Sequence, residues 1–511
     1  MKHTHLLAAV ILMSAVMVSC GDAEQPPVIN ETQPISAAST ESQAQPETEA
    51  LYDFPQVDYG AYEFRILNAA DIYSMRAQID REGLTGEALD DAMYERCRET
   101  EKRLNIVIRE SNYGVDSEVY TQANKVIRAG DDAYDAIYIP SRDMYRLTAQ
   151  DGLYNLMDFD SLQLNQPWWI NAYNDAITVN GYLFGAAGYS QLMVMDSLWC
   201  LYFNEDMMVN LDLDKPYDLV RNGSWTLERL SEYCKAAANL NGDSDFTYKV
   251  GGTAVWGISY DGIDRFMFGL GEPVLRVEDS FLSLTCGGER YINGFERILD
   301  TLTTAGGEAK PQTSGLADDT DGSYINIFET ERALFMTAEI SKTSRLRNKE
   351  FNFGVVPYPK LDESQEAYYS MPFYGTPIYS IPVTVSDAER SAVVGDVMTY
   401  ISYQSVLPVF REVTLEQKGL RNDDSIEMLD IIIRASTPNL MYVYNIGTQF
   451  INEINAAVIP VKTMLLPHSP STNPRCGQVL IKQTQNSNNK EDNDYDDPTA
   501  GICRRKGCAD V

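Results

Sequence analysis

Histidine is almost absent from the 511-residue sequence, and the few that occur lie near its two ends. They are His3, His5 and His468, so the body of the chain has none. A body without histidine lacks the base that Ser-His-Asp and Cys-His nucleophiles require, and it lacks the HExxH zinc motif. It also contains no GxxxxGK[ST] phosphate loop. We therefore expect no catalytic residues and no enzyme activity, although mechanisms that use only carboxylates stay open.

Cysteine pairs with CxxC spacing are also missing. Apart from Cys20, seven cysteines remain, an odd number that supports neither a disulfide framework nor a zinc site. Cys97 and Cys200 fall in apolar patterns and should be small core residues. Two aspartate-rich segments, 242–245 and 318–321, lack the closing glutamate of a calcium loop and are expected to be surface turns. We predict no metal and no cofactor.

Basic residues and long apolar runs are scarce. The formal net charge of −33 opposes binding to a phosphate backbone, so nucleic acid is excluded as a partner. No later segment reaches the roughly 20 apolar residues of a membrane-spanning helix. What the chain does contain is a hydrophobic fraction of 44% and 31 tyrosines, which indicate a globular protein. Its length is enough for two or three domains with cores of their own.

The N-terminus has the pattern of a lipoprotein signal peptide. Lys2 precedes an apolar run from Leu6 to Val18 that ends in Ser19 and Cys20, a motif similar to the lipobox of bacterial lipoproteins. The Cys20 thiol would carry the diacylglycerol, and the acyl chains would include palmitate. Residues 21–64 contain no lysine or arginine and are rich in Gln, Glu, Pro, Ser and Thr, a composition typical of a flexible tether. We predict a signal peptide over 1–20, a disordered tether over 21–60 and a location on the outer face of the cell membrane.

The first part of the body alternates strand and helix patterns. Strands are predicted at 64–67, 106–108 and 134–139, with a helix from a Thr85 cap to Arg103, a second helix over 119–129 that ends at Gly130, and another from Asp143. This β-α-β-α-β order predicts parallel strands under right-handed crossovers. Ligands of such sheets bind outside the carboxyl ends of the strands, which here are residues 68–73 and 141–145.

Six short segments, in this order, resemble bacterial extracellular solute-binding lipoproteins of ABC importers, family 1-like and maltose-binding-like. The segments are 85–102, 129–136, 166–169, 201–206, 223–226 and 353–360, and the resemblance covers about 64–461. It implies an α/β fold of the periplasmic-binding-protein type (type II), with two lobes, each an open sheet flanked by helices. It also implies hinge crossings near 189–200, 321–330 and 375–383. Lobe one would comprise 61–190 plus 325–378, and lobe two 191–324 plus 379–465.

A sugar-binding site requires aromatic side chains that stack on the C–H faces of the sugar and polar groups that bind its hydroxyls. Each stacked ring contributes about 1 kcal/mol of binding free energy. Polar candidates follow predicted strands, and aromatic candidates lie at the proposed hinge or near it. Trp225 is expected to pack in the core, as is one of Trp168 and Trp169. The candidate ligand-binding residues are Asn68, Asp71, Ser141, Arg142, Trp199, Trp256, Glu339 and Tyr374.

The sequence thus predicts a lipid-anchored receptor, expected to be a monomer, that delivers a small solute to the membrane subunits of an ABC importer. The favoured solute is a sugar or oligosaccharide. The alternatives are a cell-surface glycoside hydrolase that uses two carboxylates, or an adhesion or scaffold lipoprotein without a small ligand. Residues 466–511 depart from the family, with a polar run at 486–497 and a Cys503 to Cys508 ending, and are predicted to be a disordered tail.

Overall fold

The computed structural model describes residues 52–69, 76–113, 116–238, 240–242, 253–278, 281–304, 323–415 and 423–446. The predictions for Cys20, the signal peptide, Asp71 and the C-terminal tail therefore lie outside the described residues. The chain divides into two units, one up to Gln56 and one from Val57. Residues 57–60, which we expected in the tether, belong to the second unit, where the backbone N–H of Tyr59 donates to Leu104 O at 3.0 Å.

The first sheet has the strand order β10-β3-β1-β2. Its strands are β1 (Tyr62–Ala69), β2 (Ile106–Tyr113), β3 (Ala136–Pro140) and β10 (Pro377–Ser380). β1 pairs in parallel with both β2 and β3, as the alternating pattern predicted, and β10 is antiparallel to β3. The residues of β3 are buried throughout, which is typical of a strand covered on both faces.

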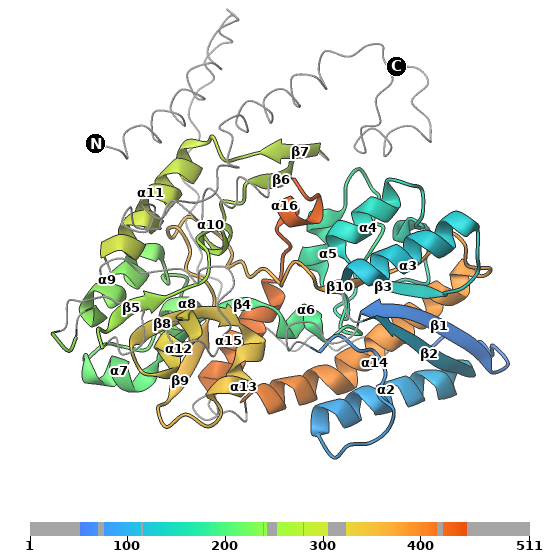
Figure 1. Cartoon of the computed structure of the whole chain (residues 1–511), viewed down its shortest axis with the longest axis horizontal. Helices are drawn as coiled ribbons and strands as arrows, with labels where there is room; N and C mark the ends of the chain where they lie inside the picture. The colour runs from blue at the N-terminus through green and yellow to red at the C-terminus, as the bar shows by residue number, and fades with distance from the viewer. Residues whose placement is uncertain are drawn as a thin grey trace, which may run out of the picture. The chain divides into compact units, whose positions relative to one another are not determined.

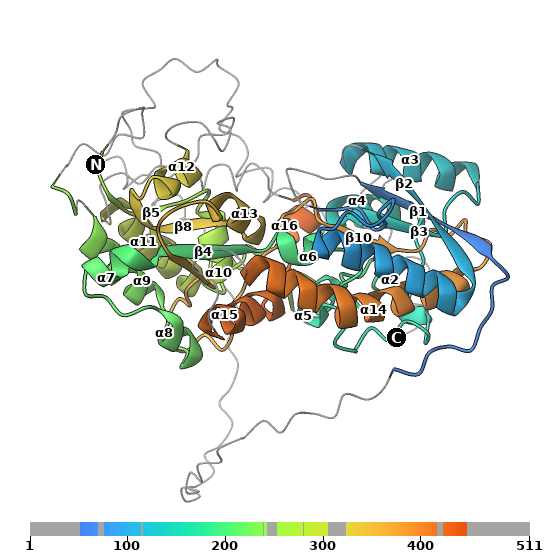
Figure 2. The ribbon, with the colours of Figure 1, turned by 90° about the horizontal axis from the view of Figure 1, so that it is seen from below.

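Helices cover both faces of the first sheet, and together they form the first lobe. α3 (Asp116–Ala129) lies on one side of the sheet, and α2 (Ala88–Leu104) and α14 (Ala388–Leu415) lie side by side on the other (Figure 2). α2 begins at Ala88 with Glu87, rather than the predicted Thr85, in the N-cap position, because the Thr85 hydroxyl accepts from the N–H of Glu87 and closes a local turn instead. α3 ends as predicted at Ala129, and the following Gly130 has a φ of +69°.

The second sheet has the strand order β5-β8-β4-β9 and forms the second lobe with its helices (Figure 1). The strands are β4 (Trp199–Asn204), β5 (Trp256–Ser259), β8 (Ala333–Glu339) and β9 (Phe353–Val356). β5 and β8 are parallel, whereas β4 is antiparallel to both β8 and β9. The surrounding helices include α9 (Leu227–Ala237), α10 (Asp264–Gly269), α11 (Glu289–Thr304), α12 (Tyr324–Glu329) and α15 (Asp423–Arg434).

Shorter elements complete the described fold. A separate hairpin is formed by β6 (Leu275–Glu278) and β7 (Phe281–Leu284). The remaining helices are α4 (Ser141–Thr148), α5 (Asn171–Ile177), α6 (Met193–Asp196), α7 (Glu205–Asn210), α8 (Tyr217–Arg221), α13 (Thr343–Leu346) and α16 (Leu440–Val443), with 3-10 turns η1 (Leu156–Asp158) and η2 (Ile340–Lys342). No helix in the described ranges is both long and apolar enough to cross a bilayer.

The hinge between the lobes is formed by two antiparallel segments. The backbone N–H of Trp199 donates to Met371 O at 3.0 Å, and that of Phe373 donates to Ser197 O at 3.0 Å. The first segment lies within the crossing predicted near 189–200, whereas the second lies just before the one predicted near 375–383, because residues 377–380 already form β10 of the first sheet. The crossing predicted near 321–330 does not occur, because α12 and β8, on either side of residue 330, both belong to the second lobe with β5.

The fold class is therefore confirmed, whereas the division of the chain between the lobes differs from the prediction. β8 and β9 lie within 325–378, which we assigned to the first lobe, but they pair with β4 in the second. Conversely, α14 follows residue 379 and packs on α2 in the first lobe. The physical reason is that β8 is an apolar strand buried along its whole length, which is stable only between two neighbouring strands, here β5 and β4.

Candidate functional site

The edge of the second sheet at the hinge collects polar and aromatic side chains from several strands. β5 and β8 are parallel, so both have their carboxyl ends at this edge, while the antiparallel β4 begins there. Glu339 is the last residue of β8, and Trp199, directly opposite it, is the first of β4. Asp261 and Arg265 follow the end of β5. The topology alone therefore brings these four residues together.

Arg265 is the centre of this group. Its guanidinium lies over the Trp199 ring, 4.0 Å from the ring centroid. The guanidinium also lies 3.3 Å from a carboxylate oxygen of Asp261 and 3.4 Å from one of Asp264. Burial alone would lower the pKa of Arg265, but the two carboxylates raise it by more. The net shift of the pKa is therefore upward, and the side chain stays charged. A charged guanidinium on the indole face is a favourable cation–π arrangement.

Glu339 is a buried carboxyl group with an unusual protonation equilibrium. Its side chain is 6% exposed, and Oε2 has no hydrogen-bond partner among the described residues. Burial raises the pKa of Glu339 to about 7, while Lys342 and Arg265 oppose the rise. The Glu339 carboxyl should therefore titrate close to neutral pH. The indole N–H of Trp199 is likewise buried without a partner in the described part of the chain.

Aromatic rings connect this edge to the first lobe. Tyr442 of α16 donates through its hydroxyl to Asp264 Oδ2 at 3.1 Å, and its ring stacks on Tyr374 with centroids 5.3 Å apart. The Arg142 guanidinium, which follows β3 in the first lobe, lies 5.2 Å from the centroid of the Tyr374 ring. α16 itself contacts α4 and α5 of the first lobe and β6 of the second (Figure 1).

We name this set the interlobe cluster, because its members reach from the first lobe to the second. It comprises Arg142, Tyr374, Tyr442, Asp264, Arg265, Trp199 and Glu339. The cluster combines aromatic faces, carboxylates and guanidinium groups, which are the groups that bind C–H faces and hydroxyls of a polar, uncharged ligand. No group of three His, Cys, Asp or Glu suited to a metal ion occurs in the residues that the structure describes.

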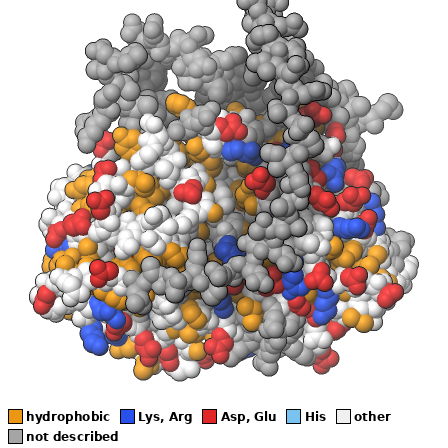
Figure 3. Space-filling model, turned by 180° about the vertical axis from the view of Figure 1, so that it is seen from behind, with side chains coloured by type: hydrophobic (Ala, Val, Ile, Leu, Met, Phe, Trp, Pro, Cys, Tyr) orange, Lys and Arg blue, Asp and Glu red, His pale blue; other side chains and the backbone are white. Residues whose placement is uncertain are grey.

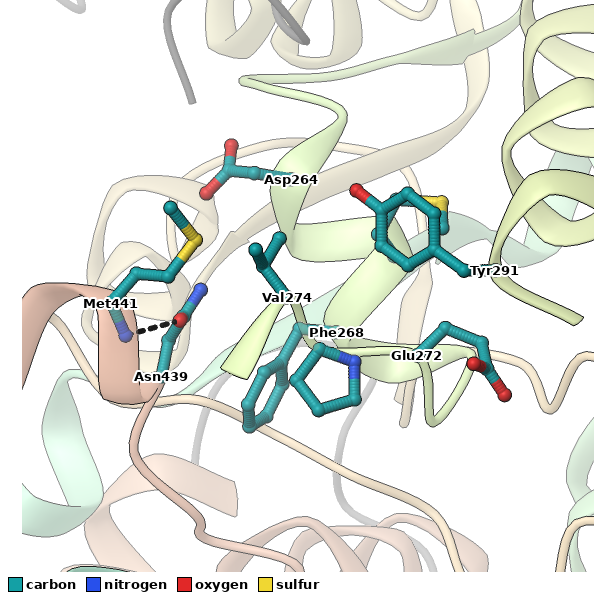
Figure 4. Close-up of a pocket in the computed structure, with 9 residues that line it drawn as sticks. Asp264, Phe268, Glu272, Val274, Tyr291, Asn439 and Met441 are labelled. Carbon is teal, nitrogen blue, oxygen red and sulfur yellow. Dashed lines mark hydrogen bonds between the residues drawn. The ribbon is translucent and has the colours of Figure 1, made fainter. Parts of the chain in front are cut away.

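A small cavity adjoins the cluster at Asp264, which lines it (Figure 4). It is lined by Asp264, Phe268, Glu272, Tyr291 and Met441, with Asn439 accepting from the backbone N–H of Met441 at its edge. Its volume of about 10 Å³ accommodates little more than one water molecule. The cavity is therefore too small for a sugar ring, and the interlobe cluster is the better candidate site.

Four of the predicted ligand-binding residues lie in the interlobe cluster: Arg142, Trp199, Glu339 and Tyr374. The structure places the other described candidates elsewhere. Asn68 is fully buried at the end of β1, where its amide donates to Ala77 O at 2.6 Å and to Glu110 Oε1 at 2.7 Å. Ser141 and Trp256 are also buried, and the Ser141 hydroxyl lies beside that of Tyr173. We do not include these three in the candidate site.

Three further members of the interlobe cluster were not among the predicted residues: Asp264, Arg265 and Tyr442. A signal for the first two was present, because the segment after the strand at Trp256 contains Asp261, Asp264 and Arg265, and residues after a parallel strand lie at its carboxyl end. Tyr442 follows no strand and reaches the cluster only through the position of α16, which no local pattern reveals.

Three residues that the sequence predicted to lie in the core are buried in the structure: Trp225, Cys97 and Cys200. The Trp225 indole is fully buried and donates to Pro357 O at 3.0 Å. Cys97 and Cys200 are buried free thiols. Acidic and basic side chains are interspersed on the face seen in Figure 3, so the net negative charge is not gathered into one region there.

No protein-family model and no curated protein matches the chain. The fold is similar to solved solute-binding proteins. An ABC substrate-binding protein from Listeria monocytogenes in complex with cycloalternan has 13% identity and a TM-score of 0.48, over 78% of this chain and 94% of that one. The maltose/maltodextrin-binding domain MalE from Bdellovibrio bacteriovorus, bound to maltotriose, has 15% identity and a TM-score of 0.46, over 83% and 100%. RafE from Streptococcus pneumoniae, in its apo form, has 13% identity and a TM-score of 0.49, over 80% and 95%. At these identities the matches concern the fold and not the ligand.

Proposed function

We propose that the chain is a lipid-anchored receptor that captures a carbohydrate outside the cell and delivers it to an ABC importer. The observation that carries this proposal is the interlobe cluster, in which aromatic rings and hydrogen-bonding groups from both lobes meet beside the hinge. Groups on two hinged bodies can close on a ligand together, so that binding shifts the hinge equilibrium. The lipobox-like Cys20 and the tether-like composition after it support the anchor.

The ligand should be released chemically unchanged. Asp261 and Asp264 both lie against Arg265, and these ion pairs already engage the carboxylates that a hydrolase would need as a nucleophile. Burial, however, raises the pKa of Glu339 to about 7, and a raised pKa is also typical of the general acid of a glycoside hydrolase. A test of the function must therefore look for cleavage as well as for binding.

The experiment is a thermal-shift screen of the purified chain against neutral oligosaccharides, acidic sugars and peptides, followed by chromatography of the recovered ligand. We expect a neutral oligosaccharide to raise the melting temperature and to be recovered intact. Recovery of shorter fragments would identify a hydrolase, and no shift with any compound would contradict a receptor. The anchor is tested separately by metabolic labelling with radioactive palmitate, which should label the native chain but not a Cys20→Ala variant.

A further inference from the structure

The interlobe cluster contains two buried polar atoms of opposite hydrogen-bonding character. The indole N–H of Trp199 is a donor and Oε2 of Glu339 is an acceptor, and neither has a partner among the described residues. The two residues are directly opposite in the pairing of β4 with β8, so their side chains leave the same face of the sheet. Buried polar groups in proteins are nearly always satisfied, so this pair indicates a missing partner.

A single hydroxyl group matches both atoms, because its oxygen accepts a hydrogen bond while its hydrogen is donated. A phosphate or carboxylate ligand would satisfy the indole but would repel Glu339 and bring it no donor. We propose that a ligand hydroxyl bridges Trp199 and Glu339, and that Glu339 releases its proton to the solvent when the ligand binds. This inference rests on the proposed receptor function and specifies how its ligand is recognised.

The charged and titratable groups around Glu339 set the direction of this proton transfer. Lys342 on η2 and Arg265 on α10 favour the carboxylate, and Asp261 opposes it. Cys200 and Tyr202 on β4 also interact electrostatically with Glu339 but stay protonated, because burial raises the pKa of both. In the ligand-free protein, burial of Glu339 holds its pKa near 7. A hydroxyl that donates to the carboxylate lowers that pKa, so the ligand binds more tightly as the pH rises.

The test follows tryptophan fluorescence of the full chain from about pH 5 to about pH 9, with and without a pool of neutral trisaccharides (maltotriose, cellotriose, xylotriose and mannotriose). Without ligand, we expect the fluorescence to change with a midpoint near pH 7, and we expect no such midpoint in Glu339→Gln. With the trisaccharide pool, the midpoint should fall by about one pH unit, which is equivalent to about tenfold tighter binding at high pH. Glu272→Gln is the matched control, because Glu272 is also a buried carboxyl with a raised pKa but is paired with Arg290 at 2.7 Å. This variant should keep the midpoint.

A midpoint that persists in Glu339→Gln would overturn the inference. So would a pool that raises the melting temperature without moving the midpoint, and in that case the receptor function would stand. If the pool changes neither quantity, the proposed function fails and the inference fails with it.

Discussion

Trp199 and Glu339 are directly opposite each other where β4 begins and β8 ends. Both strands are buried along their whole length, so the core fixes their register. A shift of one residue would turn every side chain of β8 to the other face of the sheet. Packing of apolar residues in the second lobe therefore determines that Trp199 and Glu339 occupy paired positions at this edge of the sheet.

The buried carboxyl of Glu339 should make the stability of the protein depend on pH. Its pKa is about 7 in the folded chain and 4.5 in an unfolded one, so between these values only the unfolded state loses the proton. The free energy of unfolding should therefore fall as the pH rises from about 4.5 to about 7, by at most about 1.4 kcal/mol per unit, and then level off. Glu339→Gln should abolish this component and be more stable than the wild type at about pH 8.

Urea denaturation of both proteins at several pH values measures this effect. Other titrating groups contribute equally to the two chains, so the difference between the two stabilities isolates Glu339. Stability curves that stay parallel across the range would show that the Glu339 carboxyl is not buried as described.

The first sheet was predictable because its signals are local. Leu89, Met93 and Cys97 recur at helical spacing and are buried on α2, and the strand–helix alternation specifies parallel pairing. The division into lobes was not predictable, because β10 joins the first sheet from residue 377 and β8 joins the second from residue 333. A strand can pair with a sheet far away in the sequence only where that sheet has an unpaired edge strand. No short segment of sequence shows which edge strands are unpaired.

The candidate site was predictable where a residue ends or begins a strand, as Glu339 and Trp199 do. The site was not predictable where the burial of a polar side chain depends on residues that are distant in the sequence. Asn68 is the next-to-last residue of β1, but its amide donates to Ala77 O and to Glu110 Oε1, the latter 42 residues further along the chain. A similar position in a strand can thus place one polar side chain at a ligand site and another in the interior.

Loss of either member of the Trp199–Glu339 pair should affect ligand affinity non-additively. Trp199→Phe removes the N–H donor and Glu339→Gln removes the anionic acceptor, but both changes weaken bonds to the same ligand hydroxyl. We expect the double variant to lose less affinity than the product of the two single losses. Titration calorimetry at about pH 8 with the best oligosaccharide of the screen measures all four affinities. Fully multiplicative losses would show that the two residues contact different ligand groups.

Asp396 of α14 should be important for stability but not for ligand binding. It is fully buried and accepts from the indole N–H groups of Trp168 and Trp169, both at 2.9 Å, and from the backbone N–H of Gln163 at 3.1 Å. Asp396→Ala leaves these donors buried without an acceptor, at about 1–3 kcal/mol each. We expect urea denaturation to show a loss of about 3 kcal/mol or more. The control is Asp424, whose partly exposed side chain is paired with Arg221, and its alanine variant should change stability by less than about 1 kcal/mol.

Tyr442 and Tyr444 lie two residues apart on and just after α16 but face different neighbours. Tyr442 hydrogen-bonds to Asp264 and stacks on Tyr374, whereas Tyr444 packs edge-on against Tyr145 of the first lobe, with centroids 5.0 Å apart. Tyr442→Phe keeps the stack and removes the hydrogen bond, so we expect a loss of about 1 kcal/mol in the free energy of unfolding.

Because Asp264 also holds Arg265 over the Trp199 ring, the Tyr442→Phe change should weaken oligosaccharide binding several-fold, by about the worth of one hydrogen bond. Tyr444→Phe is the matched control, since it removes a hydroxyl from the same short helix end without touching the interlobe cluster. Affinities are measured by titration calorimetry on both variants and the wild type. Equal affinities for Tyr442→Phe and Tyr444→Phe would show that the hydrogen bond between Tyr442 and Asp264 does not contribute to ligand binding. The ligand would then lie on the hinge side of Trp199.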